Sequence, residues 1–355
     1  MIKKILYCTT SVYLSKTANY IQVNNMISAF ENKNIEVYSI FKVIKKFKHK
    51  KARLHLIESS EAKISHYIYL LKASWKSITI SNKKKCDIIY TRSITIAFIC
   101  QIFGKIPVAV ELHGPFSSKL EILFAKFLAK KKILFFCITK PLIKYIKLHV
   151  KNCECIHAPD AHSSKIVKLS NLENYYTNWS SKYKPKVGYF GLLNNQKGQK
   201  IIEGLLKYCD YARFYIYTLN SFKNNSPNLF GSGNLSYDKS LIKMNEMDFL
   251  LLTIVPQKTP RDISSFTSPL KLYEYSATGK VIIASNIPVL KEELGNEKVF
   301  FSENTVVDFC NSIKMLSKSN VIRKRISRAE IQLARQSTWA VRADLIIKSL
   351  SNVSY

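Results

Sequence analysis

Acidic side chains are scarce in this sequence. The chain of 355 residues has 24 aspartates and glutamates against 55 lysines and arginines, which gives a formal net charge of +31. Such an excess excludes a protein indifferent to anions and predicts partners such as phosphates, anionic lipid or nucleic acid. Glycine and proline are also few, with ten of each, which excludes a collagen-like or linker-rich chain. Because 47% of the residues are apolar, the chain can bury sizeable cores, and its length predicts about two domains.

Apolar runs long enough to cross a membrane are missing as well. The most apolar long window, 94–110, is interrupted by Gln101 and Lys105, whereas a spanning helix needs about 20 apolar residues. The apolar stretch at the N-terminus is too short for a signal peptide, and no small-residue cleavage site follows it. We therefore expect a cytoplasmic protein that is neither secreted nor integral to a membrane.

Zinc-ligand patterns are absent from the eight cysteines. Cys153 and Cys155 form a C-x-C without a second pair and without a nearby pair of histidines, so the spacing argues against a zinc site. Most cysteines lie within apolar runs, as buried thiols do. We expect free thiols in a reducing compartment.

Short apolar segments alternate with amphipathic ones along the first half of the chain. The expected strands are 5–8, 36–41, 87–90, 108–112 and 133–138, and the expected helices are 18–30, 64–80, 120–129 and 142–149. Strands that are apolar on both faces and alternate with helices predict a parallel sheet covered by helices.

A polar stretch, 163–186, interrupts this alternation and is rich in asparagine and serine. We expect it to connect two domains. The alternation then restarts, with expected strands at 187–190, 214–218, 249–254 and 281–284, expected helices at 200–208 and 270–277, and an amphipathic tail at 337–349. The prediction is a pair of doubly wound α/β domains with a cleft where the carboxyl ends of their strands face each other.

The segment S-P-L-K-L-Y-E-Y, which begins at Ser268, suits a nucleotide diphosphate. Ser268 is a favourable helix N-cap, and Pro269 suits the first helical position. The amides of Leu270 and Lys271 would then be free to meet a phosphate, and the Lys271 side chain adds a cation. Glu274, one turn further on, could accept hydrogen bonds from a ribose diol. The alternative is an ordinary capped helix with two exposed charges.

Four further residues are candidates for a binding or catalytic site. Gly191 permits close backbone approach to a ligand, and Lys197 would neutralise phosphate charge at the same edge, although a plain βα turn explains both. His113, in E-L-H-G, could hydrogen-bond a sugar hydroxyl or transfer a proton, or be structural. For Asp160, in H-A-P-D-A, we favour a helix cap over a position facing the cleft.

Together these segments match a known family. S-P-L-K-L-Y-E-Y-S-A-T-G-K-V-I-I-A-S, with G-Y-F-G…K-G upstream and E-L-H-G in the first half, resembles glycosyltransferase family 4. Its members are GT-B enzymes that transfer a sugar from a nucleotide-sugar. Y-L-S-K-T-A-N-Y-I-Q-V-N-N-M-I-S-A-F, which includes Asn19, resembles the N-terminal loop and first helix of the family, D-I-I-Y-T-R its strand ending in Arg92, and S-T-W-A-V-R-A the start of its last helix. The resemblance implies an acceptor-side domain, 1–165, rejoined by helix 337–355, and a donor-binding domain, 166–336.

The family's roles can be assigned where positions match. Glu274 corresponds to the second glutamate of the family's E-x7-E pair, which binds the donor ribose, but Phe266 stands at the first. Lys197 corresponds to the diphosphate-binding lysine and His113 to a histidine beside the transferred sugar, while Leu192 replaces a frequent arginine. The further expected substrate contacts are Gly191, Ser268, Pro269, Leu270, Lys271, Asn19, Arg92 and Asp160.

The resemblance implies a retaining, metal-independent hexosyltransferase without other cofactors, in which amides and Lys197 stabilise the leaving diphosphate. Its acceptor would be a lipid-linked or surface glycan of capsule, O-antigen or lipopolysaccharide biosynthesis. Phe266 keeps open a GT-B-like protein that binds without catalysis. A nucleic-acid-binding protein is the other alternative; the charge permits it, but no zinc finger, RNP-like run or basic helical arm supports it.

Lysines gather in the first half beside apolar residues, which suits the anionic surface of the inner membrane. A solvated lysine-rich surface is the alternative. The lysines are Lys42, Lys45, Lys46, Lys48, Lys50, Lys51, Lys83, Lys84, Lys85, Lys130, Lys131 and Lys132, and their apolar neighbours include Tyr67, Tyr69, Leu70, Trp75, Phe124 and Phe127.

Overall fold

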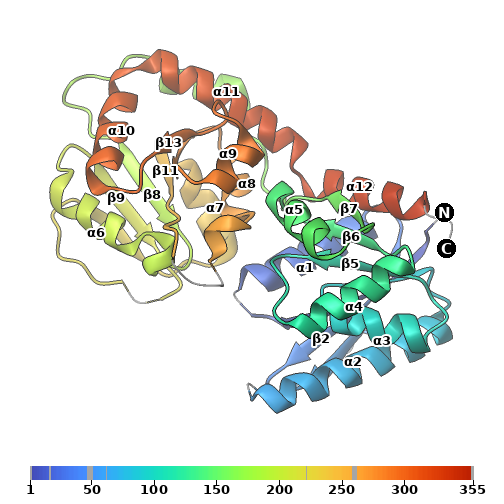
Figure 1. Ribbon diagram of the computed structural model, residues 1–355. Helices are drawn as coiled ribbons and strands as arrows, with labels where there is room; N and C mark the ends of the chain where they lie inside the picture. The colour runs from blue at the N-terminus through green and yellow to red at the C-terminus, as the bar shows by residue number, and fades with distance from the viewer. Residues whose placement is uncertain are drawn as a thin grey trace. The chain divides into compact units, whose positions relative to one another are not determined.

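The chain forms two compact units (Figure 1). One unit comprises Met1–Asp160 with Trp339–Tyr355, and the other comprises Ala161–Thr338. The structure, a computed structural model, describes residues 2–15, 17–45, 51–60, 62–220, 222–257 and 262–352. Lys46, Lys48 and Lys50 of the predicted basic run lie outside the described residues.

A parallel sheet of seven strands forms the centre of the first unit, in the order β3-β2-β1-β4-β5-β6-β7. The strands are β1 (Lys4–Val12), β2 (Glu36–Val43), β3 (Leu54–Glu58), β4 (Ile88–Thr91), β5 (Val108–Leu112), β6 (Leu134–Cys137) and β7 (Glu154–His157). Every residue of β4, β5 and β6 is buried. Strands covered on both faces are expected to be apolar throughout, which is why their sequences predicted them correctly.

Helices cover both faces of this sheet. They are α1 (Ala18–Glu31), α2 (Lys63–Lys84), α3 (Ile94–Phe103), α4 (Lys119–Lys130), α5 (Lys140–His149) and α12 (Trp339–Ser351). Helices α2, α3 and α4 pack side by side in that order, and α12 packs against α1 (Figure 1). Within the described ranges, no helix is both long enough and apolar enough to cross a membrane.

The second unit contains a parallel sheet of six strands, in the order β10-β9-β8-β11-β12-β13. The strands are β8 (Lys186–Phe190), β9 (Arg213–Tyr217), β10 (Leu229–Gly233), β11 (Phe249–Leu252), β12 (Val281–Ser285) and β13 (Phe300–Ser302). The α-helices are α6 (Gln199–Tyr208), α7 (Tyr237–Asn245), α8 (Leu270–Ser276), α9 (Pro288–Leu294), α10 (Val306–Lys318) and α11 (Asn320–Gln336). The predicted pair of doubly wound α/β units is confirmed.

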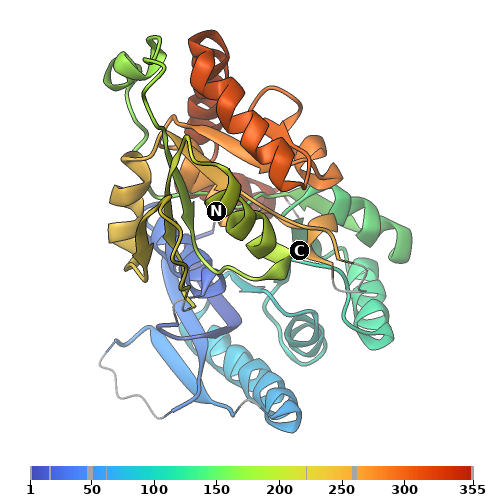
Figure 2. The ribbon, with the colours of Figure 1, turned by 90° about the vertical axis from the view of Figure 1, so that its left-hand side faces the viewer.

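The prediction that the polar stretch 163–186 connects the two units is wrong. The stretch belongs to the second unit and lies beside α11 (Figure 2). Two short 3₁₀ helices, η1 (Leu169–Leu172) and η2 (Asn174–Tyr176), bury Leu172 and Tyr175 in the core. The reason is that burying the few apolar and aromatic side chains of this stretch in the core is favourable, although most of its residues are polar.

Candidate functional site

In the second unit, the end of β8 and the beginning of α8 are joined. Gly191, the residue after β8, has a φ of +113°, which favours glycine, and its amide donates to the Tyr217 carbonyl at 2.9 Å. The Tyr275 hydroxyl of α8 accepts a hydrogen bond from the Phe190 amide at 3.0 Å. The two segments that the sequence singled out therefore form one structure.

The Lys271 ammonium lies in this turn without a hydrogen-bond partner. Its nitrogen is buried, none of the described residues offers it an acceptor, and it stands 3.9 Å from the centroid of the Tyr189 ring. A Cβ on Gly191 would come within 3.3 Å of the Lys271 Cε, so the glycine leaves room for the lysine. Burial, and then the charge of Lys197, hold the pKa of Lys271 well below its usual range, while Glu274 acts in the opposite sense. A desolvated cation of this kind is stabilised by an anion that enters beside it.

Lys197 reaches the same place from the turn before α6. The Asn194 side chain accepts from its amide at 3.0 Å, and its carbonyl accepts from the Thr253 hydroxyl at 2.6 Å. The next residue, Gly198, has a φ of +78°, and a Cβ there would lie 2.5 Å from the Thr253 Cβ. Burial lowers the pKa of Lys197. Two lysines, each with a depressed pKa, thus form the charged part of the site.

The predicted cap at Ser268 is wrong. Helix α8 begins at Leu270, and Pro269 occupies the N-cap position rather than the first turn. Its carbonyl accepts from the Leu272 amide at 2.9 Å, whereas the Ser268 hydroxyl lies 3.1 Å from the Tyr273 hydroxyl and forms no cap. The amides of Leu270 and Lys271 still belong to the first turn, where a helix provides no acceptor of its own.

Glu274 is buried, with 5% of its surface exposed. The idea of an ordinary helix with two exposed charges is therefore wrong. After burial itself, the negative charge of Glu274 is the largest influence that raises the pKa of Tyr237, at the start of α7. Phe266 is partly buried, and Leu192 is exposed. Gly191, Lys197, Lys271 and Glu274 are thus brought together in the second unit.

The first unit contains a separate cluster at the carboxyl edge of its sheet. Arg92 follows β4 and His113 follows β5, and these strands are neighbours. The guanidinium of Arg92 donates to the Asn19 carbonyl at 3.3 Å and to the Gln22 side chain at 3.2 Å. The structure therefore brings Asn19, Arg92 and His113 together, with Asn19 exposed on the first turn of α1.

Glu111, near the end of β5, is the centre of this cluster. It is 2% exposed and contacts the His113 ring nitrogen Nε2. The guanidinium of Arg342, on α12, lies 3.3 Å from the Glu111 carboxylate, and that of Arg92 lies 3.7 Å from it. Burial alone would raise the pKa of Glu111, but Arg342, His113 and Arg92 together hold it well below its usual range. Two arginines thus keep a buried carboxylate ionised.

Asp160 is not a helix cap, contrary to the prediction. It is 1% exposed, and no helix begins beside it. Its carboxylate accepts from the Gln22 amide at 2.6 Å, which links it to Arg92. Burial raises the pKa of Asp160 to about 7, against the opposing charges of Arg342 and Arg92. The segment after β7 is drawn into the unit because Arg342 binds the Ala158 and Pro159 carbonyls.

Sequence reasoning missed four participants, namely Glu111, Arg342, Gln22 and Tyr189. All four stand inside segments already matched to the family, Y-L-S-K-T-A-N-Y-I-Q-V-N-N-M-I-S-A-F, E-L-H-G, S-T-W-A-V-R-A and G-Y-F-G. A polar or aromatic residue inside a matched segment is therefore the signal that could have found them.

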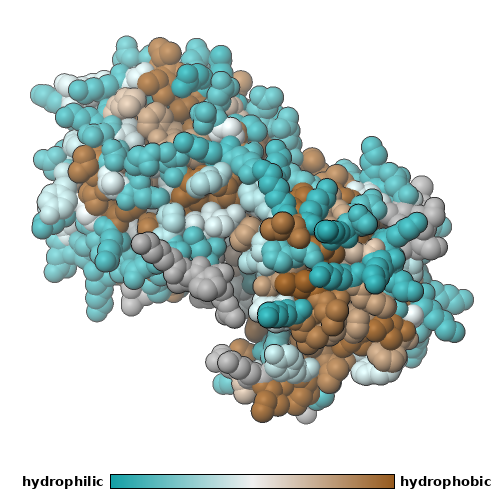
Figure 3. All heavy atoms as spheres, in the orientation of Figure 1, coloured by the Kyte–Doolittle hydropathy of each residue, from teal (hydrophilic) through white to brown (hydrophobic). Residues whose placement is uncertain are grey.

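The first unit also presents an apolar and basic face on α2, α3 and α4, visible in Figure 3 as brown patches flanked by teal. Large apolar side chains are exposed there, among them Ile64 (74%), Trp75 (54%) and Leu123 (61%). Helices α2 and α4 carry eight lysines and one carboxylate, Glu121. Tyr69 and Leu70, predicted on this face, are instead buried, because they lie on the side of α2 that packs on the sheet.

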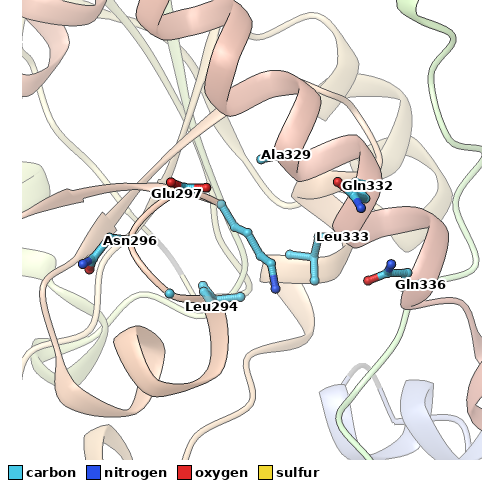
Figure 4. Close-up of a pocket in the computed structure, with 9 residues that line it drawn as sticks. Leu294, Asn296, Glu297, Ala329, Gln332, Leu333 and Gln336 are labelled. Carbon is cyan, nitrogen blue, oxygen red and sulfur yellow. The ribbon is translucent and has the colours of Figure 1, made fainter.

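A hollow of about 580 Å³ lies elsewhere in the second unit, between the loop after α9 and the end of α11 (Figure 4). Its lining includes Leu294, Asn296, Gln332 and Gln336 and none of the predicted site residues. Across the described ranges, no group of three or more histidine, cysteine or acidic side chains is arranged to hold a metal ion.

Comparisons with known proteins agree with this architecture. No protein-family model matches the chain, and no curated protein matches it. Solved structures do match, with TM-scores of 0.71 for a glycosyltransferase from Rickettsia africae, 0.69 for the lipopolysaccharide outer core galactosyltransferase WaaB and 0.67 for Anabaena HepE in complex with UDP-glucose. Each is 14% identical; the matches cover 98–99% of this chain and 99–100% of the other. The predicted GT-B fold of glycosyltransferases is therefore confirmed.

Proposed function

We propose that this protein is a glycosyltransferase that takes a hexose from a nucleotide-sugar. The observation that carries the proposal is the buried Lys271 ammonium, which has no hydrogen-bond acceptor and lies beside Lys197. Burial lowers the pKa of both lysines, and the charge of Lys197 lowers that of Lys271 further, so the pair is unfavourable until a doubly charged group binds between them. A diphosphate has that charge, and the sugar-nucleotide ligand of HepE contains one.

In this proposal, different residues of the second unit bind different parts of the donor. Lys197, Lys271 and the first-turn amides of α8 bind the diphosphate, and Glu274 accepts hydrogen bonds from the ribose. As the glycosidic bond breaks, negative charge grows on the leaving diphosphate, and preorganised donors stabilise it by about 3–4 kcal/mol each. We infer from the family resemblance that the reaction retains the anomeric configuration and needs no metal. His113 of the first unit would bind the sugar.

The acceptor in this proposal is a lipid-linked or surface glycan, such as capsule, O-antigen or lipopolysaccharide. The first-unit face on α2, α3 and α4 supports it, because exposed apolar side chains among lysines suit an anionic bilayer. The name of the similar WaaB refers to the lipopolysaccharide outer core. The protein would then be cytoplasmic and peripheral at the inner membrane.

A screen of UDP-, GDP- and other nucleotide-sugars tests the donor site. We expect at least one to raise the midpoint of thermal unfolding and to be slowly hydrolysed. Lys197→Ala and Lys271→Met should weaken binding at least tenfold, because each removes a cation next to the diphosphate. Lys200→Ala, an exposed lysine on the neighbouring α6, is the matched control. Failure of every nucleotide-sugar to bind, with salt-sensitive binding of any oligonucleotide, would favour the nucleic-acid alternative.

A further inference from the structure

We propose that Glu111 is a positioning residue that holds His113 as the neutral imidazole with its proton on Nε2, so that Nδ1 accepts a hydrogen bond from a sugar hydroxyl. The sugar in this statement rests on the proposed function. The charge and the tautomer of His113 are properties of the chain alone and can be measured without any substrate.

The Glu111 carboxylate is surrounded by donors. Its Oε2 accepts from the Tyr90 hydroxyl at 2.6 Å and from Arg342 at 3.4 Å. Its Oε1 faces Arg342 at 3.3 Å and Arg92 at 3.7 Å and contacts the His113 Nε2. Protonating this carboxylate would place a hydrogen among donors, so it stays ionised, as the direction of its pKa shift also indicates.

The ionised carboxylate determines the tautomer of His113. A carboxylate without a proton can only accept hydrogen bonds, so the His113 Nε2 must carry the hydrogen in their contact. The ring is also neutral near pH 7, because burial and the charge of Arg92 lower the pKa of His113 to about 4. Arg342 lowers this pKa further, and Glu111 raises it. A neutral ring with its proton on Nε2 has a lone pair on Nδ1.

The surroundings of His113 leave room for a ligand. Its side chain is 21% exposed, and a Cβ built on the adjacent Gly114 would meet no described atom within 4 Å. The ring stands just beyond β5, at the carboxyl edge where parallel α/β sheets bind ligands. His113 is therefore suited to orient a hydroxyl as a hydrogen-bond acceptor, and it is too weak a base to keep the proton.

Nitrogen NMR on the ¹⁵N-histidine-labelled full chain tests the charge and the tautomer directly. His113→Gln assigns its signal among the seven histidines. We expect a proton on Nε2, none on Nδ1 and no titration between pH 5.5 and 8. A proton on Nδ1, or a titration near pH 6.5, would overturn the proposal.

Variants separate positioning from simple structural support. Arg92→Met removes the cation that disfavours a charged ring, so it should shift the His113 titration upward, toward pH 6.5. Arg53→Met, an exposed arginine of the same unit, is the control and should leave the signal unchanged. An unshifted His113 in the Arg92→Met protein would contradict the electrostatic argument.

Turnover provides the second readout. Once a donor is found, Glu111→Gln should lower kcat/KM for transfer at least tenfold, because it removes the charge that orients the ring. The affinity for UDP or GDP, whichever binds, should stay the same, because that site lies in the other unit. An unchanged kcat/KM would overturn the proposal. If the wild-type chain transfers no sugar, the proposed function fails, and the NMR result still decides the state of His113.

Discussion

Two buried glutamates show how strongly surroundings decide the charge of one residue type. Glu111 is surrounded by two arginines, a tyrosine and a histidine, and its pKa is held low. Glu330 of α11 is equally buried, but its Oε1 accepts only from the Ile282 amide, at 2.7 Å, and no described residue reaches its Oε2. Burial therefore raises the pKa of Glu330 well above its usual range. The first carboxylate is built to be charged and the second to remain protonated.

Glu330→Gln should make stability less dependent on pH. The folded pKa lies above the unfolded value of about 4.3, so the folded state holds a proton that the unfolded state releases. The contribution of Glu330 to the stability of the wild-type chain therefore falls as pH rises above that value. Urea unfolding should show the free energy of unfolding of the variant rising relative to that of the wild type between pH 4.5 and pH 8.

The exposed Glu297→Gln, in the same unit, serves as the control and should follow the wild-type pH dependence. A Glu330→Gln curve parallel to the wild type would mean that Glu330 ionises in the folded protein as readily as in the unfolded one.

A strand can be predicted from sequence when its own residues show the apolar pattern of a buried strand. Strand β12, V-I-I-A-S, is buried throughout, and its sequence alone predicts it. Strand β10, L-F-G-S-G, has no fully buried residue and carries no such pattern, so it was missed. Site residues divide likewise: Gly191 and Lys271 were found within local motifs, but the pairing of Glu111 with Arg342 spans 231 residues. A contact so distant in sequence leaves no local trace.

One buried side chain of a distant helix contacts the segment 163–186 at several points. Arg323 of α11 is fully buried and donates to the carbonyls of Tyr175 at 3.2 Å and Thr177 at 2.5 Å. Its guanidinium also stacks 3.8 Å above the Trp179 ring. One arginine thus satisfies two backbone carbonyls of a segment that has little regular structure of its own.

Arg323→Lys should release this segment while the charge is kept. Lysine lacks the planar fork that reaches several carbonyls at once, and unsatisfied buried groups cost about 1–3 kcal/mol each. We expect a lower thermal midpoint and faster cleavage by trypsin between residues 163 and 186. Arg325→Lys, an exposed neighbour on the same helix, should change neither, and equal cleavage of the two variants would count against this role of Arg323.

At the scale of the whole molecule, the two units carry different chemistry. The second unit places two buried lysines, Lys197 and Lys271, at one turn beside β8, where a small anion suffices to neutralise them. The first unit spreads lysines over the outer surface of α2 and α4, among exposed apolar side chains. A small anion cannot cover such a face, whereas a bilayer can receive both the apolar groups and the charges.

Vesicle binding tests this division. The chain should bind phosphatidylglycerol vesicles more tightly than phosphatidylcholine vesicles, and added salt should weaken the binding, because each lysine near the surface contributes about 1 kcal/mol. Leu71→Ser with Trp75→Ser should lower binding at least tenfold, since burying one large apolar side chain is worth about 1.5–3 kcal/mol. Ile242→Ser, on α7 of the other unit, where the side chain is even more exposed than Leu71 and Trp75, is the control. Equal binding of both lipids, or equal losses in the two variants, would exclude the α2–α4 face as the membrane contact.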